Sequence, residues 1–229
     1  MSGAIGRRLE EVLRRIAAAC DAAGRLPSDV TLVAVGKTFP AEIVAEAVAS
    51  GATDLGENRV QEAASKKADV PPATWHLIGP LQRNKAGTAL KTFDMIHTVD
   101  RPELAQRLQL LLERDWPDRR LSVLAEINVG SEPQKAGALP EEAAALVRAV
   151  AACDRLDLQG LMAIPPYQTD PEASRPYFRR LWDLRESLQD RLGLALPQLS
   201  MGMSHDFDVA IDEGATIVRV GTAIFGPRG

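Results

Sequence analysis

The sequence predicts an α/β protein, a single (β/α)8 TIM barrel over residues 1–229 with an extra helix at its N-terminus. Short apolar runs recur along the chain, helical stretches separate them, and each unit spans roughly two dozen residues. Eight such units fit a barrel of about 250 residues. We find no linker, low-complexity tract or shift in composition that would divide the chain.

The first expected element is an amphipathic helix that covers the bottom of the barrel. Its apolar residues recur at the spacing of one helix face: Ile5, Leu9, Val12, Leu13 and Ile16. The segment lacks the apolar core of a secretion signal, and Glu10 and Glu11 argue against a transit peptide.

The barrel units follow in order, and helical stretches come after the strands. We expect strands at 30–35, 54–56, 75–79, 95–99, 122–129, 158–163, 199–201 and 217–220. The helices with limits that can be predicted are 41–50, 58–68, 140–152 and 171–192.

A doubly wound open sheet is the alternative fold. It normally has fewer strands and carries a glycine-rich phosphate loop after the first of them. Gly36-Lys37-Thr38 resembles the end of a P-loop, but the earlier glycine of that motif is missing from the strand before it. The barrel is therefore the preferred interpretation.

Composition argues against two classes of partner. The formal net charge of −4 is unlike the basic patch of nucleic-acid binders, and no apolar run approaches the roughly 20 residues that span a bilayer. Cys20 and Cys153 show no metal-binding or redox spacing, which predicts free thiols in a reducing compartment. We expect a cytoplasmic protein that binds neither nucleic acid nor membrane.

Lys37 follows the first expected strand, at the end where barrels place functional groups. Val33, Val35 and Lys37 share one face by the two-residue period, so the amine continues an inward apolar row. Burial there lowers the pKa of an amine and favours the neutral nucleophile that adds to an aldehyde. The alternative is a lysine that extends from a strand end into solvent.

Two small-residue loops follow the last two expected strands, where this fold habitually binds phosphate. Their backbone N–H groups and hydroxyls suit a phosphate dianion, although tight turns and a helix cap by Ser204 also account for them. The candidates are Ser200, Gly202, Met203, Ser204, Gly221 and Thr222. With Lys37, they predict a phosphorylated aldehyde held as a Schiff base, and pyridoxal phosphate is the obvious candidate.

Arg219 interrupts the last apolar strand, where a charge needs a partner. That partner is either a buried carboxylate such as Glu126 or the ring nitrogen of pyridoxal phosphate. Because arginine keeps its proton, the ring nitrogen would stay unprotonated and the cofactor would be a poor electron sink. Asn58 and Asn128 lie at the same expected rim, where each either orients the cofactor or caps a turn.

The three histidines show no metal-ligand spacing, so we expect no metal site. His76 and His97 lie within expected strands and are interpreted as hydrogen-bonded core residues. His205 is expected on the exposed first turn of a helix.

Longer sequence blocks surround these candidates, in order from about residue 30 to residue 228: VAVGKTFP, GENRVQE, WHLIGPLQRNK, INVGSEPQKAG, LMAIPP, LSMGMSHDFDVAI and VRVGTAIFGPR. They resemble the YggS/PROSC family of pyridoxal phosphate homeostasis proteins, which is related to the barrel domain of bacterial alanine racemases. The resemblance implies a fold-type-III barrel with Lys37 bonded to the cofactor, the loop residues around its phosphate, Arg219 at its ring nitrogen and Asn58 nearby. Gly36 and His205 depart from the family's common residues.

The resemblance also implies a role without efficient catalysis. The protein would buffer pyridoxal phosphate, or hand it to apo-enzymes, and so maintain vitamin B6 homeostasis. Because the chain stops at Gly229, we expect no second β-rich domain with the catalytic tyrosine of alanine racemases, and we expect a monomer. The alternatives are a slow amino-acid racemase, a Schiff-base aldolase, and a sensor that acts through protein partners.

Overall fold

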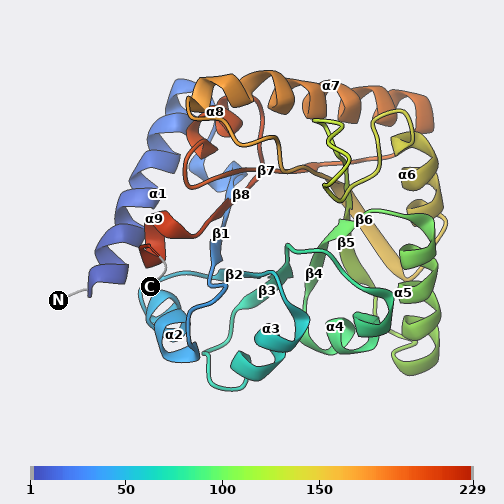
Figure 1. Cartoon of the computed structure of the whole chain (residues 1–229), viewed down its shortest axis with the longest axis horizontal. Coiled ribbons are helices and arrows are strands. Elements are labelled where there is room, and N and C mark those ends of the chain that lie inside the picture. Colours follow the sequence, from blue (N-terminus) through green and yellow to red (C-terminus); the bar gives the residue numbers. More distant parts are fainter. Residues whose placement is uncertain (1–2, 228–229) are drawn as a thin grey trace.

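The computed structural model describes residues 3–227. Eight parallel strands within this range close into a barrel (Figure 1). Both ends of the predicted 1–229 domain, and Arg228 of the last sequence block, lie outside the described residues. The strands pair in chain order, and β8 pairs with β1. They are β1 (Thr31–Val35), β2 (Asp54–Glu57), β3 (Thr74–Leu77), β4 (Met95–Val99), β5 (Leu121–Glu126), β6 (Leu156–Met162), β7 (Gln198–Met203) and β8 (Ile217–Val220). The predicted barrel is confirmed.

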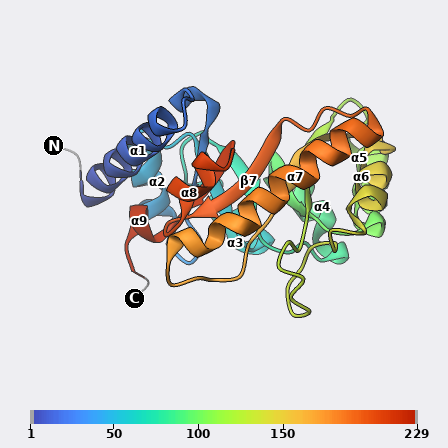
Figure 2. The same ribbon diagram turned by 90° about the horizontal axis from the view of Figure 1, so that it is seen from above.

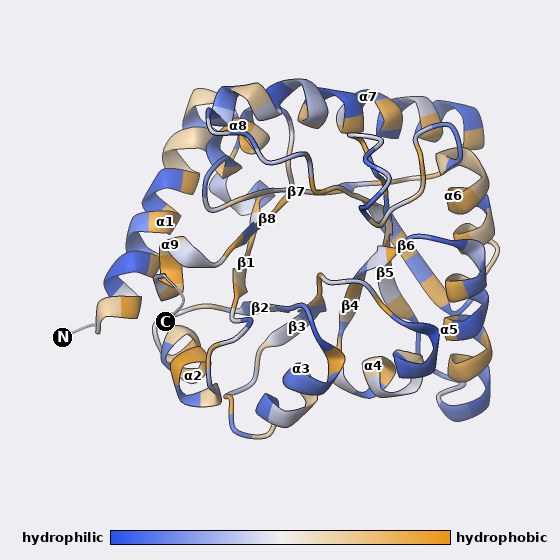
Figure 3. Cartoon of the chain, viewed as in Figure 1, coloured by the Kyte–Doolittle hydropathy of each residue, from blue (hydrophilic) through white to orange (hydrophobic). Residues whose placement is uncertain are grey.

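Helices surround the barrel and follow its strands. They are α1 (Ala4–Ala22), α2 (Ala41–Ala49), α3 (Val60–Lys66), α4 (Ala86–Thr92), α5 (Pro102–Asp115), α6 (Ala143–Ala151), α7 (Arg175–Leu192), α8 (Phe207–Asp212) and α9 (Thr222–Phe225). Their apolar faces turn toward the strands and their polar faces toward solvent (Figure 3). This pattern is what burial of one stripe of each helix requires.

The expected amphipathic helix forms, but its position differs from the prediction. α1 packs along α8 and α9 on the side of the barrel, instead of covering its bottom (Figures 1 and 2). Because α8 and α9 are short, α1 supplies the apolar cover of the seam between β8 and β1. Leu13, at the edge of the apolar stripe, is 46% exposed.

The apolar core has two parts. The larger lies between the strands and the helices, and the smaller fills the inside of the barrel. The inner part consists of Val33, Met95, Leu124, Met162 and Ile217. This filling closes the barrel below the strand ends, so a ligand must bind at the rim.

The strand limits differ from the prediction where the chain bends. Residues 127–129 leave β5 because Ile127 pairs with Ala138 in the next loop. β7 extends to Met203, so Gly202 and Met203 lie in a strand and not in the predicted loop. Gly202 has φ +89°, and a Cβ there would lie 2.6 Å from the Ala210 Cβ, so only glycine fits this bend.

The expectation for the two cysteines is met. Cys20 and Cys153 are buried free thiols. Among residues 3–227, no helix is both long enough and apolar enough to cross a bilayer.

Candidate functional site

A cavity of about 390 Å³ opens at the carboxyl ends of the strands, where barrels place their functional sites. Its walls come from the ends of β1, β2, β3, β7 and β8 and from the loop after β6. The predicted site residues among its lining are Lys37, Asn58, Met203, Ser204, Arg219, Gly221 and Thr222. Residues far apart in the sequence therefore meet at the expected place.

Ser200 and Gly202 are absent from this lining. The pairing of β7 with β8 shifts between Ser200 and Met203, and this bulge changes which face each residue occupies. Ser200 is fully buried inside the barrel, and Gly202 packs against Phe207 and Ala210 of α8. The phosphate contacts predicted for these two residues stay a prediction.

The loop after β6 contributes lining residues that sequence reasoning missed: Ile164, Pro165, Pro166, Tyr167 and Gln168. The sequence block LMAIPP ends in this loop, so its position after a strand was the available signal. Tyr167 is 77% exposed, and its ring centroid lies 5.9 Å from that of His205. These two rings form an aromatic edge at the mouth of the cavity.

The turn that carries Lys37 is held by buried ionic groups. Lys66 Nζ donates to the Gly36 carbonyl at 3.1 Å, to Glu57 Oε1 at 2.7 Å and to Glu62 Oε1 at 2.6 Å. Glu62 Oε1 also accepts the Thr38 N–H at 2.6 Å. Thr38 has φ +71°, a strained value for a β-branched residue, so the turn needs these restraints.

Arg219 is 3% exposed and lies at the floor of the cavity. It donates to Ser200 Oγ at 2.5 Å and to the Ala163 carbonyl at 2.9 Å. Burial lowers its pKa to about 10, although the carboxylates of Glu126 and Asp206 act in the opposite direction. The guanidinium therefore stays protonated near neutral pH and can only donate hydrogen bonds.

Ser204 does not cap α8, contrary to the alternative drawn from the sequence. Its hydroxyl oxygen accepts the Gly221 N–H at 3.1 Å and the Ala223 N–H at 3.4 Å, across to the start of α9. Asp206 takes the other role, because its Oδ1 accepts the Met203 N–H at 2.8 Å and fixes the turn before α8. The two predicted loops thus meet at one point, with hydroxyl and N–H groups side by side.

The two asparagines have different positions. Asn58 lines the cavity, whereas the Asn128 amide bonds the backbone of Glu132 in both directions, at 2.8 Å and 3.1 Å. Asn128 therefore stabilises a turn. His76 and His97 are buried and hydrogen-bonded, as expected for core residues.

Glu126 makes the stability of the protein depend on pH. Burial, with repulsion from Asp100, raises its pKa to about 7 against the attraction of Arg219. A carboxyl whose folded pKa is raised stabilises the fold at low pH, and this contribution is lost as pH rises from about 4.5 to about 7.

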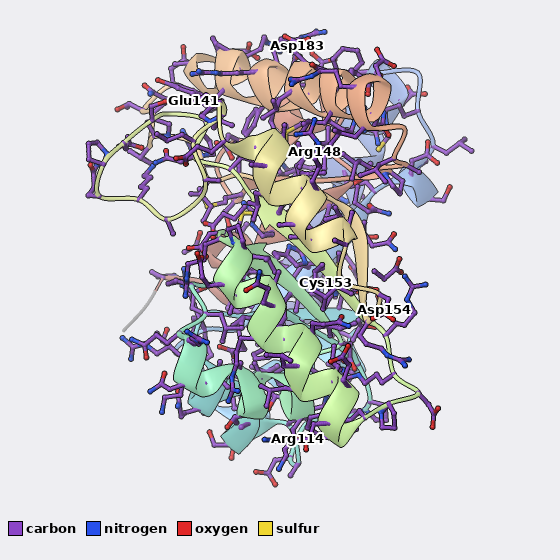
Figure 4. All side chains as sticks on the ribbon, turned by 90° about the vertical axis from the view of Figure 1, so that its right-hand side faces the viewer. Arg114, Glu141, Arg148, Cys153, Asp154 and Asp183 are labelled. Carbon is purple, nitrogen blue, oxygen red and sulfur yellow. The ribbon has the colours of Figure 1, made fainter. Side chains whose placement is uncertain are left out.

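We therefore expect Glu126→Gln to gain stability relative to the wild type as pH rises from about 4.5 to about 8, by roughly 2–3 kcal/mol. Urea unfolding at several pH values measures this difference. Glu141→Gln, at an exposed position near α6 (Figure 4), is the matched control and should show no such trend. Parallel pH profiles for Glu126→Gln and the wild type would contradict the assignment.

Comparisons with known proteins agree with this architecture. The alanine racemase N-terminal domain family matches residues 9–229. A pyridoxal phosphate homeostasis protein of Aquifex aeolicus is 45% identical over 224 residues, which cover 96% of this chain and 97% of the relative. The solved structure of PipY from Synechococcus elongatus, with PLP bound, has a TM-score of 0.84 and 37% identity, covering 97% of this chain and all of PipY.

An alanine racemase of Clostridium difficile shares the fold alone, with 17% identity and a TM-score of 0.73 over 94% of this chain and 59% of that enzyme. The relatives that match over nearly their full length are more similar to this chain than the alanine racemase is. The chain therefore belongs to the pyridoxal phosphate homeostasis protein family, within the alanine racemase N-terminal domain family.

Proposed function

We propose that this protein holds pyridoxal phosphate as a Schiff base on Lys37 and thereby maintains the intracellular supply of that cofactor. The observation that carries the proposal is one cavity in which an amine, a buried guanidinium and a cluster of hydroxyl and N–H groups line the same space. Pyridoxal phosphate supplies three groups: a phosphate, a ring nitrogen, and an aldehyde that reacts with an amine. Each of these groups has a matching side chain here.

The residues fit the group in both size and charge. A cavity of about 390 Å³ lies within the range of small-molecule sites. Met203, Ser204, Gly221 and Thr222 would hold the phosphate, Arg219 would donate to the ring nitrogen, and Asn58 would lie beside the ring. Ser200 would act behind Arg219 instead of at the phosphate. The PLP bound to PipY and the names of the curated relatives support pyridoxal phosphate as the ligand.

We further propose that the protein is a carrier or buffer and not an efficient enzyme. Arg219 cannot give its proton to a ring nitrogen, so it would leave the cofactor weak at stabilising a carbanion. PLP-dependent apo-enzymes would be the recipients. The protein would act as a monomeric single domain over residues 1–229 in the cytoplasm, and light scattering of the purified chain measures its oligomeric state.

The direct experiment is borohydride reduction followed by peptide mapping in a mass spectrometer, with and without added pyridoxal phosphate. We expect a phosphopyridoxyl group on the peptide that carries Lys37. The absence of an adduct on every lysine would reject the proposal and favour a Schiff-base aldolase. Deuterium uptake at the α-carbon of L-alanine, at a rate that tracks the loaded protein, would instead indicate a slow racemase.

Ser204→Ala is expected to weaken pyridoxal phosphate binding about tenfold. The variant removes a hydroxyl from the proposed phosphate cradle, and a hydrogen bond to a charged group contributes about 1.5 kcal/mol. Absorbance titration measures the dissociation constants for pyridoxal phosphate and for pyridoxal, which lacks the phosphate. An equal loss for both ligands would place Ser204 away from the phosphate.

A further inference from the structure

A continuous chain of hydrogen bonds crosses the inside of the barrel and ends at Arg219. It begins at Asp54, the first residue of β2, whose side chain is 19% exposed and borders a second cavity of about 400 Å³ beneath α1. Asp54 Oδ1 lies 2.9 Å from His76 Nε2, and His76 Nδ1 lies 2.9 Å from His97 Nε2. His97 Nδ1 lies 2.9 Å from Ser200 Oγ, which accepts from Arg219.

The two ends of this chain fix its direction. A guanidinium can only donate hydrogen bonds, and an ionised carboxylate can only accept them. Burial acts to raise the pKa of Asp54, but hydrogen bonds from His76 and Thr53 outweigh it and hold that pKa below its ordinary value. Asp54 is therefore ionised near neutral pH, and with both imidazoles neutral the groups between it and Arg219 carry their hydrogens in one order.

That order can be worked out atom by atom. Ser200 Oγ accepts from Arg219 and sends its own hydrogen to His97 Nδ1. His97 then carries its hydrogen on Nε2 and donates it to His76 Nδ1, and His76 donates its Nε2–H to Asp54. Both imidazoles are neutral in this arrangement, and burial lowers the pKa of His97 well below its usual value, in agreement. Every nitrogen and oxygen along the path then has a partner.

We propose that Asp54, His76 and His97 are positioning residues for Arg219, acting through a one-directional hydrogen-bond relay that orients the Ser200 hydroxyl. A serine hydroxyl alone rotates freely, and His97 removes that freedom. The relay keeps an acceptor lone pair of Ser200 on Arg219, so the guanidinium is held at the cavity floor. This inference rests on the proposed function only in naming the ring nitrogen as the group that Arg219 meets.

The relay explains why polar groups lie inside an otherwise apolar barrel. The inner apolar cluster fills the same barrel, and its five side chains are hydrophobic. Removing one member leaves the next one buried and unpaired, which lowers stability. We expect such a buried network only where the orientation of its last member matters.

The first test needs no variant. Long-range ¹H–¹⁵N correlation spectra of the ¹⁵N-labelled protein report which ring nitrogen of each histidine carries hydrogen, and the sequence has three histidines to assign. We expect His76 and His97 to be neutral with hydrogen on Nε2, both with and without added pyridoxal phosphate. Hydrogen on Nδ1 of His97 would overturn the relay, whether or not the cofactor binds.

The second test removes the remote end. Asp54→Ala is expected to shift the His97 nitrogen signals and the absorption spectrum of the protein loaded with pyridoxal phosphate, and to weaken that binding about fivefold, the value of one hydrogen bond. Thr53→Ala is the matched control, because Thr53 donates to the other Asp54 oxygen, Oδ2, at 2.7 Å and lies outside the path. It should leave both spectra unchanged.

These readouts separate positioning from a merely structural role. A structural role would lower the unfolding midpoint of Asp54→Ala and leave the His97 signals and the cofactor spectrum as in the wild type, which would reject the proposal. Should Asp54→Ala fail to fold, Asp54→Asn keeps the shape and removes the charge, and the same two spectra decide. Failure of the proposed function would appear separately, as no borohydride adduct on Lys37.

Discussion

Replacing Lys37 with alanine is expected to abolish the covalent adduct with pyridoxal phosphate completely. The side chain lines the same cavity as the proposed phosphate cradle, and no other lysine belongs to that lining among residues 3–227. Without the amine, no nucleophile can add to the aldehyde, while the proposed phosphate contacts remain. The measurement is intact-protein mass spectrometry after borohydride reduction.

Noncovalent binding provides the second readout for Lys37→Ala. We expect a weaker but measurable affinity for pyridoxal phosphate, because Ser204, Gly221 and Thr222 are untouched. Lys91→Ala, at an exposed position on α4, is the matched control and should keep the full adduct. A reducible adduct that persists in Lys37→Ala would show that another lysine is the attachment point.

Lys66→Met is expected to destabilise the protein by about 3–5 kcal/mol, because it leaves the Glu57 carboxylate buried without its counter-ion. The two side chains are 8% and 1% exposed, so solvent cannot replace the lost bond. The variant also frees the Gly36 carbonyl and the Glu62 carboxylate, both of which restrain the turn around Lys37. Urea unfolding measures the loss, and the rate of adduct formation reports the looser turn.

A double variant separates charge from packing at this position. Burial raises the pKa of Glu57 to about 7 even against its bonds to Lys66. Adding Glu57→Gln to Lys66→Met removes the unpaired charge and should recover a large part of the stability. Lys67→Met, at the partly exposed end of the same helix, should cost less than about 1 kcal/mol. An equal loss for Lys66→Met and Lys67→Met would contradict the buried ion pair.

The sequence predicts those parts of the site that depend on local periodicity. Arg219 is identified correctly as a cavity residue because the two-residue period of a strand decides which side chains face inward. Lys37 is identified correctly because it follows a strand at the end where barrels place their sites. The loops after β7 and β8 are located correctly because barrels place their sites at that end. Both inferences need only one strand at a time.

The missed features depend on contacts between strands. The relay through His76 and His97 depends on three further residues, which lie in β2, β7 and β8. No local sequence pattern contains the register between these strands. A bulge, invisible in the sequence, alters the alternation of β7 before the predicted loop, and Ser200 does not line the cavity. The fold class was therefore easier to predict than the details of its interior.

The seam between β8 and β1 has a consequence for synthesis of the chain. Lys37 leaves the ribosome early, whereas Arg219, Gly221 and Thr222 leave it among the last described residues. Because β1 gains its second neighbour only after β8 has been synthesised, the barrel and its cavity are completed in the same late step. A nascent chain thus contains Lys37 before it contains the residues proposed to hold the phosphate, so under the proposed function cofactor binding would begin only once the barrel has closed.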